Sequence, residues 1–247
     1  MTTKRICLFD VDGTLTKPRQ VRTPMIECLE QVRCRGIPLA VVGGSDMPKI
    51  LEQLDCNIHN EKFSYIFSEN GLVSYRGKDM LPVKTIQDEI GEVKLQKFIN
   101  YCLSYMSNLE LPCKRGNFVE FRKGMLNISP IGRSCSQKER EEFVAYDEAH
   151  RIRSTFVEDM KHKFPLEEYS LQFSIGGQIS IDVFPVGWDK RFCLQYLIND
   201  GYSEIYFFGD KTEKGGNDYE IYSDERTIGH RVSSPADTVA LLTKLFL

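Results

Sequence analysis

The two ends of the chain follow one pattern and the middle follows another, and this division constrains the fold more than any other feature. In roughly the first 80 residues, short apolar runs such as Arg5–Phe9 and Ile37–Val42 alternate with segments of helical periodicity. The last 60 or so residues return to this pattern, with a strand predicted over Ile205–Gly209 and a helix over Thr238–Leu245. Alternating strands and helices predict a parallel sheet covered by helices, here built from both ends of the chain.

The middle of the chain has the pattern of an antiparallel α+β module. Leu171–Pro185 largely alternates between apolar and polar residues around two glycines, which is typical of a hairpin. Ser136–Glu139 has the spacing of a capping box and predicts the start of a helix. We therefore expect a core domain formed by residues 1–82 and 187–247, interrupted by an inserted domain at residues 83–186. Four basic residues of the insert are expected to form a solvated helix face: Arg151, Arg153, Lys161 and Lys163.

Composition argues against several classes of protein. The 247 residues carry 32 Lys and Arg against 35 Asp and Glu, which disfavours nucleic acid as the main partner. No apolar run approaches the roughly 20 residues of a membrane-spanning helix, so we expect no membrane association. Eight scattered cysteines without a C-x-x-C pair, and only four histidines, argue against a structural zinc site. With no secretory signal at the N-terminus, we expect reduced, mostly buried thiols in a cytoplasmic protein.

A pair of carboxylates follows the first predicted strand, in the segment Phe9-Asp10-Val11-Asp12-Gly13-Thr14-Leu15. Ligands of open parallel sheets bind at the carboxyl ends of the strands. Two acids this close repel each other unless a proton or a cation lies between them, and Mg²⁺ with oxygen ligands suits such a pair. The Asp-x-Asp-Gly pattern alone is also typical of an ordinary acidic turn. The apolar strand before it favours a functional site at Asp10 and Asp12.

Further polar groups follow other predicted strands or begin a helix. Ser45 follows the second strand and two glycines, and its hydroxyl could donate to a phosphate oxygen, although turn chemistry alone explains the pattern. Lys190 stands in the first turn of a predicted helix, where the helix dipole does not favour a cation. It is therefore either simply exposed or placed for an anion. Asp210 ends the strand predicted over Ile205–Gly209, and Asn217 and Asp218 follow it. A carboxylate at this position is what a metal between Asp10 and Asp12 would need.

One face of the predicted hairpin in the insert is polar. Ser174, Ser180 and Asp182 share this face by their alternation, and hydroxyl groups with one carboxylate suit hydrogen bonding to a sugar. Arg122 ends another predicted strand, whose alternation directs it to the polar face. Guanidinium groups bind phosphate in a bidentate manner. Arg19, Arg133 and Arg140 are further candidates to bind phosphate. By composition alone, all four arginines are ordinary surface residues.

The order of these motifs resembles that of the haloacid dehalogenase-like phosphotransferase superfamily, and within it the eukaryotic phosphomannomutases. The likeness runs over nearly the whole chain. The segments that carry it are Gly43–Asp46, Phe118–Ser136, Ser180–Pro185, Gly187–Arg191, Gly209–Thr212 and Gly215–Asp218. The resemblance implies an α/β fold, with a Rossmann-like core and an inserted α+β cap domain that carries an antiparallel sheet.

The resemblance also implies an activity. A phosphomannomutase interconverts mannose 6-phosphate and mannose 1-phosphate through an aspartyl-phosphate and a hexose bisphosphate, and so supplies GDP-mannose synthesis. Asp10 would be the nucleophile and Asp12 the general acid/base. Lys190 and Ser45 would orient the phosphoryl group. A hexose 1,6-bisphosphate would be the activator.

The expected ligands follow from the same resemblance. Mg²⁺ would be held by Asp10, the backbone carbonyl of Asp12 and Asp210, with Asn217 or Asp218 contributing a further oxygen. A second cation loop would use Tyr222, Asp224 and Thr227. The substrate-binding residues would be Arg19, Arg122, Arg133, Arg140, Ser180 and Asp182.

Some alternatives stay open at the level of the sequence. A sugar-phosphate phosphatase of the same superfamily would use the same core residues, and a non-catalytic sugar-phosphate sensor would not need the nucleophile. The preference between mannose and glucose phosphates is not set by the pattern. A homodimer through the cap domain is expected from the family alone.

Overall fold

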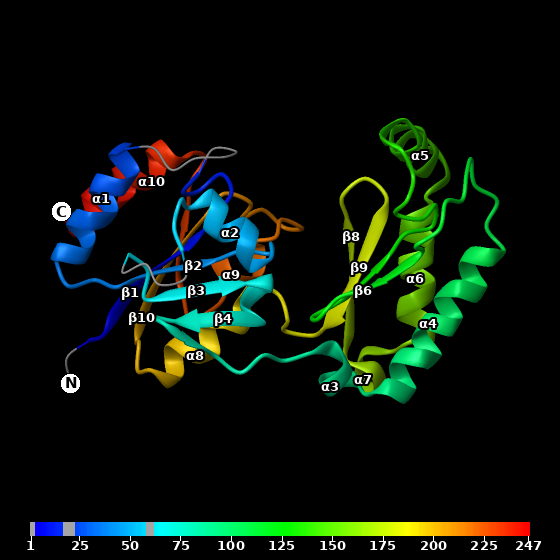
Figure 1. Ribbon diagram of the computed structural model, residues 1–247, viewed down its shortest axis with the longest axis horizontal. Coiled ribbons are helices and arrows are strands. Elements are labelled where there is room, and N and C mark those ends of the chain that lie inside the picture. The colour runs from blue at the N-terminus through cyan, green and yellow to red at the C-terminus, as the bar shows by residue number, and fades with distance from the viewer. Residues whose placement is uncertain (1–2, 17–22, 58–61) are drawn as a thin grey trace. The chain divides into compact units, whose positions relative to one another are not determined.

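The chain forms two compact units, described by a computed structural model over residues 3–16, 23–57 and 62–247 (Figure 1). The core unit consists of Met1–Val83 and Gly187–Leu247, and the inserted unit of Lys84–Val186. Each unit has its own sheet and its own helices, so each is described by itself.

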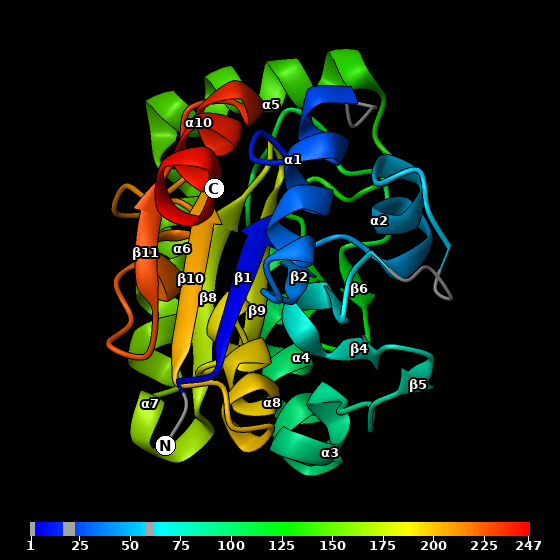
Figure 2. The same cartoon turned by 90° about the vertical axis from the view of Figure 1, so that its left-hand side faces the viewer.

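The core unit is built on a seven-stranded sheet in the order β11-β10-β1-β2-β3-β4-β5 (Figure 2). The strands are β1 (Arg5–Asp10), β2 (Leu39–Val42), β3 (Tyr65–Ser68), β4 (Val73–Arg76), β5 (Asp79–Met80), β10 (Glu204–Gly209) and β11 (Ile228–Arg231). The strands from β11 to β3 in this order are parallel, as the sequence predicts. Strands β4 and β5 add an antiparallel edge that the periodicity did not reveal.

Helices cover both faces of this sheet. They are α1 (Thr23–Cys34), α2 (Met47–Gln53), α8 (Leu194–Asn199), α9 (Tyr219–Tyr222) and α10 (Pro235–Phe246), with 3₁₀ turns η1 (Glu69–Gly71) and η2 (Lys190–Cys193). Cys7 and Phe9 of β1 are buried with the α1 and α10 side chains, whereas Ile6 and Leu8 are buried with α8. This alternation is that of a strand with a hydrophobic core on each side. The expected α/β core is therefore confirmed.

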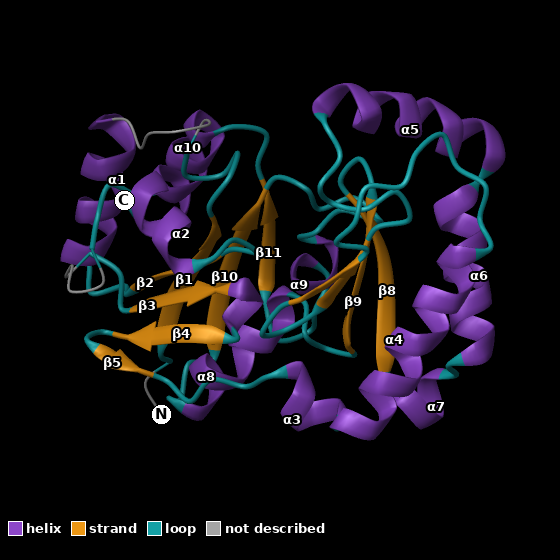
Figure 3. Ribbon diagram, turned by 45° about the vertical axis from the view of Figure 1, so that its right-hand side comes forward, coloured by secondary structure: helices purple, strands orange, loops and turns teal. Residues whose placement is uncertain are grey.

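The inserted unit has an antiparallel sheet in the order β6-β7-β9-β8, with helices α4 and α6 along one face (Figure 3). Its strands are β6 (Val119–Phe121), β7 (Leu126–Ile128), β8 (Leu171–Gly176) and β9 (Ser180–Pro185). Its helices are α3 (Ile86–Ile90), α4 (Glu92–Ser107), α5 (Gln137–His150), α6 (Ile152–Lys163) and α7 (Leu166–Tyr169). Strands β8 and β9 form the predicted hairpin. In the described part of the chain, no helix combines the length and apolar character that crossing a bilayer requires.

The predicted capping box is present at the start of α5. The Ser136 side chain accepts from the Glu139 backbone N–H, and the Glu139 carboxylate accepts from the Ser136 backbone N–H. These two bonds satisfy donors that a helix N-terminus otherwise leaves unpaired. Helix α5 therefore begins where the sequence predicts, and Arg140 lies in its first turn.

The expectation of a solvated basic face is wrong for Arg153, which is buried at the start of α6. Its Nε donates to the Asp147 carboxylate at 2.6 Å, and both side chains are only 10% exposed. Its Nη1 also donates to the carbonyl oxygen of Gly177 at 3.0 Å, in the β8–β9 turn. The charge of Arg153 thus ties α5, α6 and the hairpin together. Helical periodicity could not reveal this, because the partner lies on the neighbouring helix.

Replacing Arg153 by Met should destabilise the inserted unit by about 3 kcal/mol, because it leaves the Asp147 carboxylate buried without its cation. Chemical denaturation monitored by circular dichroism would measure the loss. Arg151→Met is the matched control, since the Arg151–Glu158 pair is 70% and 68% exposed. Such exposed pairs contribute about 0–1 kcal/mol. Equal losses in the two variants would contradict the structural role of Arg153.

Candidate active site

Three carboxylates meet at the carboxyl ends of neighbouring parallel strands in the core unit. Asp10 is the last residue of β1, and Asp210 comes directly after β10, which pairs with β1. Asp218 follows in the loop before α9 and is fully buried. One carboxylate oxygen from each residue lies within 4.8 Å of the other two. The strand-end rule applied to the sequence thus predicted the meeting of Asp10 and Asp210 correctly.

Lys190 lies among these carboxylates, with 2% of its side chain exposed. It occupies the first position of η2, and its Nζ donates to Asp10 Oδ1 and to Asp218 Oδ1. The Asp218 carboxylate also accepts from the backbone N–H of Lys211 at 3.1 Å. The alternative that Lys190 is merely exposed is therefore wrong. Its ammonium group orders two of the three carboxylates.

Burial and like charges dominate the electrostatics of this cluster. Burial raises the pKa of Asp10 to about 7, and Asp218 and Asp210 add to the increase while Lys190 opposes it. Burial, followed by the charge of Asp218, also raises the pKa of Asp210. Burial disfavours the Lys190 ammonium, but Asp10 and Asp218 outweigh this effect and raise the pKa of Lys190. A site with this excess of negative charge favours a bound cation.

The Asp10–Asp210–Asp218 cluster fits a divalent metal. Asp210 Oδ1 is buried and has no hydrogen-bond partner among the described residues. The cluster holds three carboxylates, two of them paired with the Lys190 ammonium, and oxygen ligands of this kind suit Mg²⁺. The Asp218 carboxylate already accepts from Lys190 and Lys211, which leaves Asp10 and Asp210 as the better placed ligands. Asn217, directly before Asp218, is exposed, and its contribution of a metal ligand stays a prediction.

Gly13 brings the first motif close to Asp210. Its φ is +82°, and a Cβ built at this position would lie 2.4 Å from Asp210 Oδ2. The turn after Asp12 therefore needs glycine for two reasons, the backbone conformation and the close approach of a carboxylate.

Gly13→Ala should lower the affinity for Mg²⁺ by about tenfold or more, because the methyl group displaces a candidate ligand. Gly36→Ala is the matched control, since Gly36 has a φ of +78° and no atom within 4 Å of the added Cβ. Both variants should lose about 1–3 kcal/mol of stability from backbone strain. Calorimetric titration with Mg²⁺ would separate them, and an unchanged affinity in Gly13→Ala would contradict the assignment of Asp210.

The remaining predicted residues of the first two motifs differ in their exposure and in their contacts. The Asp12 side chain is exposed, and its carboxylate accepts a hydrogen bond from Gln53 Nε2. Ser45 is half-buried in the loop after β2, whose last residue Val42 is in register with Asp10. Arg19 lies outside the described residues.

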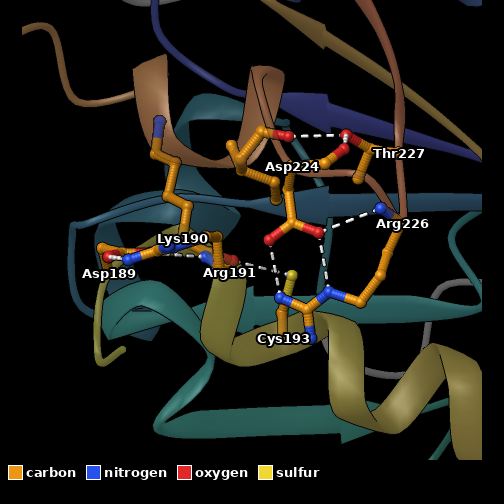
Figure 4. A network of polar contacts seen from close by, with 8 residues as sticks. Asp189, Lys190, Arg191, Cys193, Asp224, Arg226 and Thr227 are labelled. Carbon is orange, nitrogen blue, oxygen red and sulfur yellow. Dashed lines mark hydrogen bonds and ion pairs between the residues drawn. The ribbon is translucent and has the colours of Figure 1, made fainter. Parts of the chain in front are cut away.

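In the predicted second cation loop, the carboxylate of Asp224 is already paired with the guanidinium group of Arg226 (Figure 4). The Asp224 carboxylate accepts from the Arg226 guanidinium at 2.7 Å through both Nε and Nη2, which lowers the pKa of Asp224. The Thr227 hydroxyl donates to the Ile221 carbonyl at 2.6 Å. Tyr222 ends α9 just before this loop. Cation binding by Tyr222, Asp224 and Thr227 stays a prediction.

In the inserted unit, the sheet carries a row of polar residues across all four strands. Glu120, Asn127, Asp182 and Ser174 are successive partners in the register. Asn127 Nδ2 donates to Asp182 Oδ1 at 2.6 Å. Ser180, in the same strand as Asp182, is buried. The alternation in the sequence therefore predicted the polar character of this face correctly.

Two of the predicted arginines converge on this row. Arg122 and Arg133 both pair with the Glu120 carboxylate, the latter at 3.2 Å. Arg133 Nη1 also donates to Asn127 Oδ1 at 2.7 Å. Arg140 donates to the backbone carbonyl of Arg133 at 3.2 Å, so the three arginines form one basic group. A single carboxylate thus links the two guanidinium groups at the position where they could bind a phosphate.

Sequence reasoning missed three polar residues of these sites. Glu120 alternates with Arg122 in its strand, and that spacing could have placed both on one face. Asn127 could have been found from its place in a strand of otherwise apolar residues. Gln53 ends α2, and nothing in the local pattern distinguishes it from a solvent-exposed glutamine.

Comparison with known proteins places this chain among close relatives. The family model described as eukaryotic phosphomannomutase matches residues 25–247. A probable phosphomannomutase of Caenorhabditis elegans is 58% identical, over 96% of this chain and 93% of the relative. Phosphomannomutase 1 of Dictyostelium discoideum is 57% identical over 98% and 96%, and a phosphomannomutase of Glycine max is 54% identical over 98% and 96%.

Solved structures of lower identity share the fold. A haloacid dehalogenase-like hydrolase from Bacteroides thetaiotaomicron superposes with a TM-score of 0.53, at 15% identity, over 89% of this chain and 85% of that chain. A trehalose-6-phosphate phosphatase related protein superposes with a TM-score of 0.52, at 12% identity, over 97% and 96%. These similarities concern the fold and bear out the architecture expected from the sequence.

Proposed function

The chain belongs to the eukaryotic phosphomannomutase family, and we propose that it interconverts mannose 6-phosphate and mannose 1-phosphate through an aspartyl-phosphate and a hexose bisphosphate. The observation that carries the mechanism is the buried cluster of Asp10, Asp210 and Asp218 around Lys190. A binding protein would not need a buried carboxylate beside a lysine at the end of β1, whereas a phosphoryl acceptor does.

Asp10 is the proposed nucleophile. One of its carboxylate oxygens attacks the phosphorus of a hexose bisphosphate, the bond from phosphorus to the sugar oxygen breaks, and an aspartyl-phosphate forms. Asp12 donates a proton to the departing sugar oxygen. In the reverse direction Asp12 takes the proton from the attacking sugar hydroxyl, and the phosphoryl group returns to the other end of the hexose.

Lys190 and a metal would compensate the charge of this transfer. The Lys190 ammonium holds the Asp10 carboxylate through a hydrogen bond and leaves its second oxygen available to phosphorus. Asp10 and Asp210 would hold Mg²⁺ together with the Asp12 carbonyl, and the bound ion would neutralise developing charge on the phosphoryl oxygens. Ser45 is proposed to donate to one of these oxygens.

The arginines of the inserted unit are proposed to bind the phosphate that is not being transferred. Arg122, Arg133 and Arg140 outnumber the carboxylate of Glu120, so a phosphate dianion can replace Glu120 as their partner. Ser180 and Asp182 would bind hydroxyl groups of the sugar. Arg19 is also proposed to bind substrate. A mutase needs such a second anchor because the bisphosphate must be retained while it reverses its ends, whereas a phosphatase releases its product.

A single assay tests the proposed reaction. The protein is incubated with mannose 1-phosphate, Mg²⁺ and a catalytic amount of hexose 1,6-bisphosphate, and both hexose 6-phosphate and free phosphate are followed. We expect the 6-phosphate to accumulate far faster than free phosphate, and only when the bisphosphate activator is present. Release of phosphate in excess of isomer formation would instead establish a sugar-phosphate phosphatase. Glucose 1-phosphate in parallel would measure the preference between hexoses.

Asp12→Asn should slow turnover by about 10²–10⁴-fold with little change in sugar-phosphate binding, because the amide cannot exchange a proton with the sugar oxygen. Steady-state kinetics and direct titration with mannose 1-phosphate would measure the two effects. Comparable losses in turnover and in affinity would argue against acid/base catalysis by Asp12.

Two further proposals concern the cellular compartment and the oligomeric state of the protein. All eight cysteines are free thiols, and five of them are buried, which supports a reducing compartment such as the cytoplasm. The family leads us to propose a homodimer formed through the inserted unit.

A further inference from the structure

Gln53 contacts the side chain of Asp12 in the core unit. Its Nε2 donates a hydrogen bond to Asp12 Oδ1. The other polar atom of the amide, Oε1, is buried and has no hydrogen-bond partner among the described residues. The amide is therefore committed to Asp12 through its nitrogen, while its oxygen remains free to accept.

The helix that carries Gln53 is fixed at both ends. The Asp46 side chain caps the start of α2 by accepting from the Lys49 backbone N–H at 3.1 Å. Ile50, three residues before Gln53, is fully buried, and Leu54, the residue after it, is 3% exposed. Residues three and four apart share a helix face, so the burial of Ile50 also sets the direction of Gln53.

The same helix packs against the loop that follows β2. A Cβ built on Gly43 would lie 3.1 Å from Ile50 Cδ1, so the turn and the helix are in close contact. Gln53 thus lies on a helix that is packed against the core, whereas Asp12 is exposed and precedes the glycine turn at Gly13. An exposed carboxylate on such a turn can adopt several rotamers unless a neighbour holds it.

From these contacts we propose that Gln53 is a positioning residue for phosphoryl transfer, which holds the Asp12 carboxylate in one orientation through the Gln53 amide. The inference rests on the acid/base role proposed for Asp12. A glutamine amide suits this task because it can hold both forms of an acid/base group. Nε2–H donates to a carboxylate, and after the amide turns over, Oε1 accepts from a carboxylic acid. Because Oε1 has no other hydrogen-bond partner among the described residues, rotating the amide breaks no other hydrogen bond of this oxygen.

Gln53→Met tests the proposal, because methionine has a similar length and no hydrogen-bonding amide. We expect kcat to fall by about 10- to 100-fold, a part of what a well-placed acid/base contributes, with an unchanged KM for mannose 1-phosphate. Gln53→Glu should lose at least as much, since an ionised glutamate cannot donate to Asp12. Glu52→Met is the matched control, as Glu52 is an exposed residue on the same helix. Thermal unfolding should be similar in all three variants.

A double-mutant cycle separates positioning from a general structural effect. In the Asp12→Asn background, followed with ³²P-labelled substrate, Gln53→Met should have less than a twofold effect, because the group that it positions has lost its function. An equal loss in both backgrounds, an unchanged kcat, or a change confined to KM would each overturn the proposal. If the protein turns out to release free phosphate and not to form an isomer, the double-mutant cycle is measured on the rate of phosphate release. The failure of the proposed mutase reaction can then be told apart from the failure of this inference about Gln53.

Discussion

Asp10→Asn should abolish phosphoryl transfer, with a loss of at least about 10⁴-fold in kcat. The amide is nearly isosteric with the carboxylate but is a poor nucleophile, so no aspartyl-phosphate can form. The fold should be retained. Burial raises the pKa of Asp10 to about 7, so its ionised form is costly in the native state, and a neutral side chain removes repulsion from Asp210 and Asp218.

Two measurements check this prediction. Product formation from mannose 1-phosphate reports turnover, and acid-stable trapping of ³²P on the protein reports the covalent intermediate. Asp79→Asn, at an exposed aspartate on β5, is the control for the substitution itself. Turnover near the wild-type level in Asp10→Asn would contradict the nucleophile assignment, and labelled protein in that variant would point to another acceptor.

The core of the site could be predicted because simple chain geometry determines it. Asp10 is the last residue of β1 and Asp210 comes directly after β10, and neighbouring parallel strands bring their carboxyl ends to one edge of the sheet. The polar face of the β8–β9 hairpin follows from alternation in the same direct way. In both cases the information lies within a few residues of each side chain.

The contacts of Lys190, Arg153 and Gln53, which the sequence did not predict, join different secondary-structure elements. The helical pattern predicted where Lys190 lies along the chain but not that its side chain is buried. Its burial depends on the carboxylates of Asp10 and Asp218, with which it pairs. The same is true of Arg153, whose partner Asp147 lies on the preceding helix. Gln53 is the extreme case, because only the packing of α2 against the loop after β2 brings its amide to Asp12. Tertiary packing decides these contacts, and local periodicity does not contain it.

Lys190→Met should lower both activity and stability, because it removes the cation that two buried carboxylates share. Without Lys190, the pKa of Asp10 should rise above its wild-type value of about 7, since the ammonium opposes the effect of burial. Asp10 is then protonated at neutral pH and cannot attack phosphorus. We expect kcat at pH 7 to fall by about 10²–10³-fold, and the rising limb of the pH–rate profile to move to higher pH.

The same substitution should change how stability depends on pH. A carboxyl whose pKa is raised in the folded state binds its proton more tightly there than in the unfolded chain, so folding loses stability as pH rises from about 4 through the folded pKa. In Lys190→Met this window extends above pH 7, and the free energy of unfolding without metal should fall by about 3–5 kcal/mol at pH 8. Mg²⁺ should restore part of this loss, because the ion compensates the same carboxylates. Denaturation at pH 5 and pH 8, with chelator and with Mg²⁺, measures each effect. A loss independent of both pH and metal would show that Lys190 acts by packing alone.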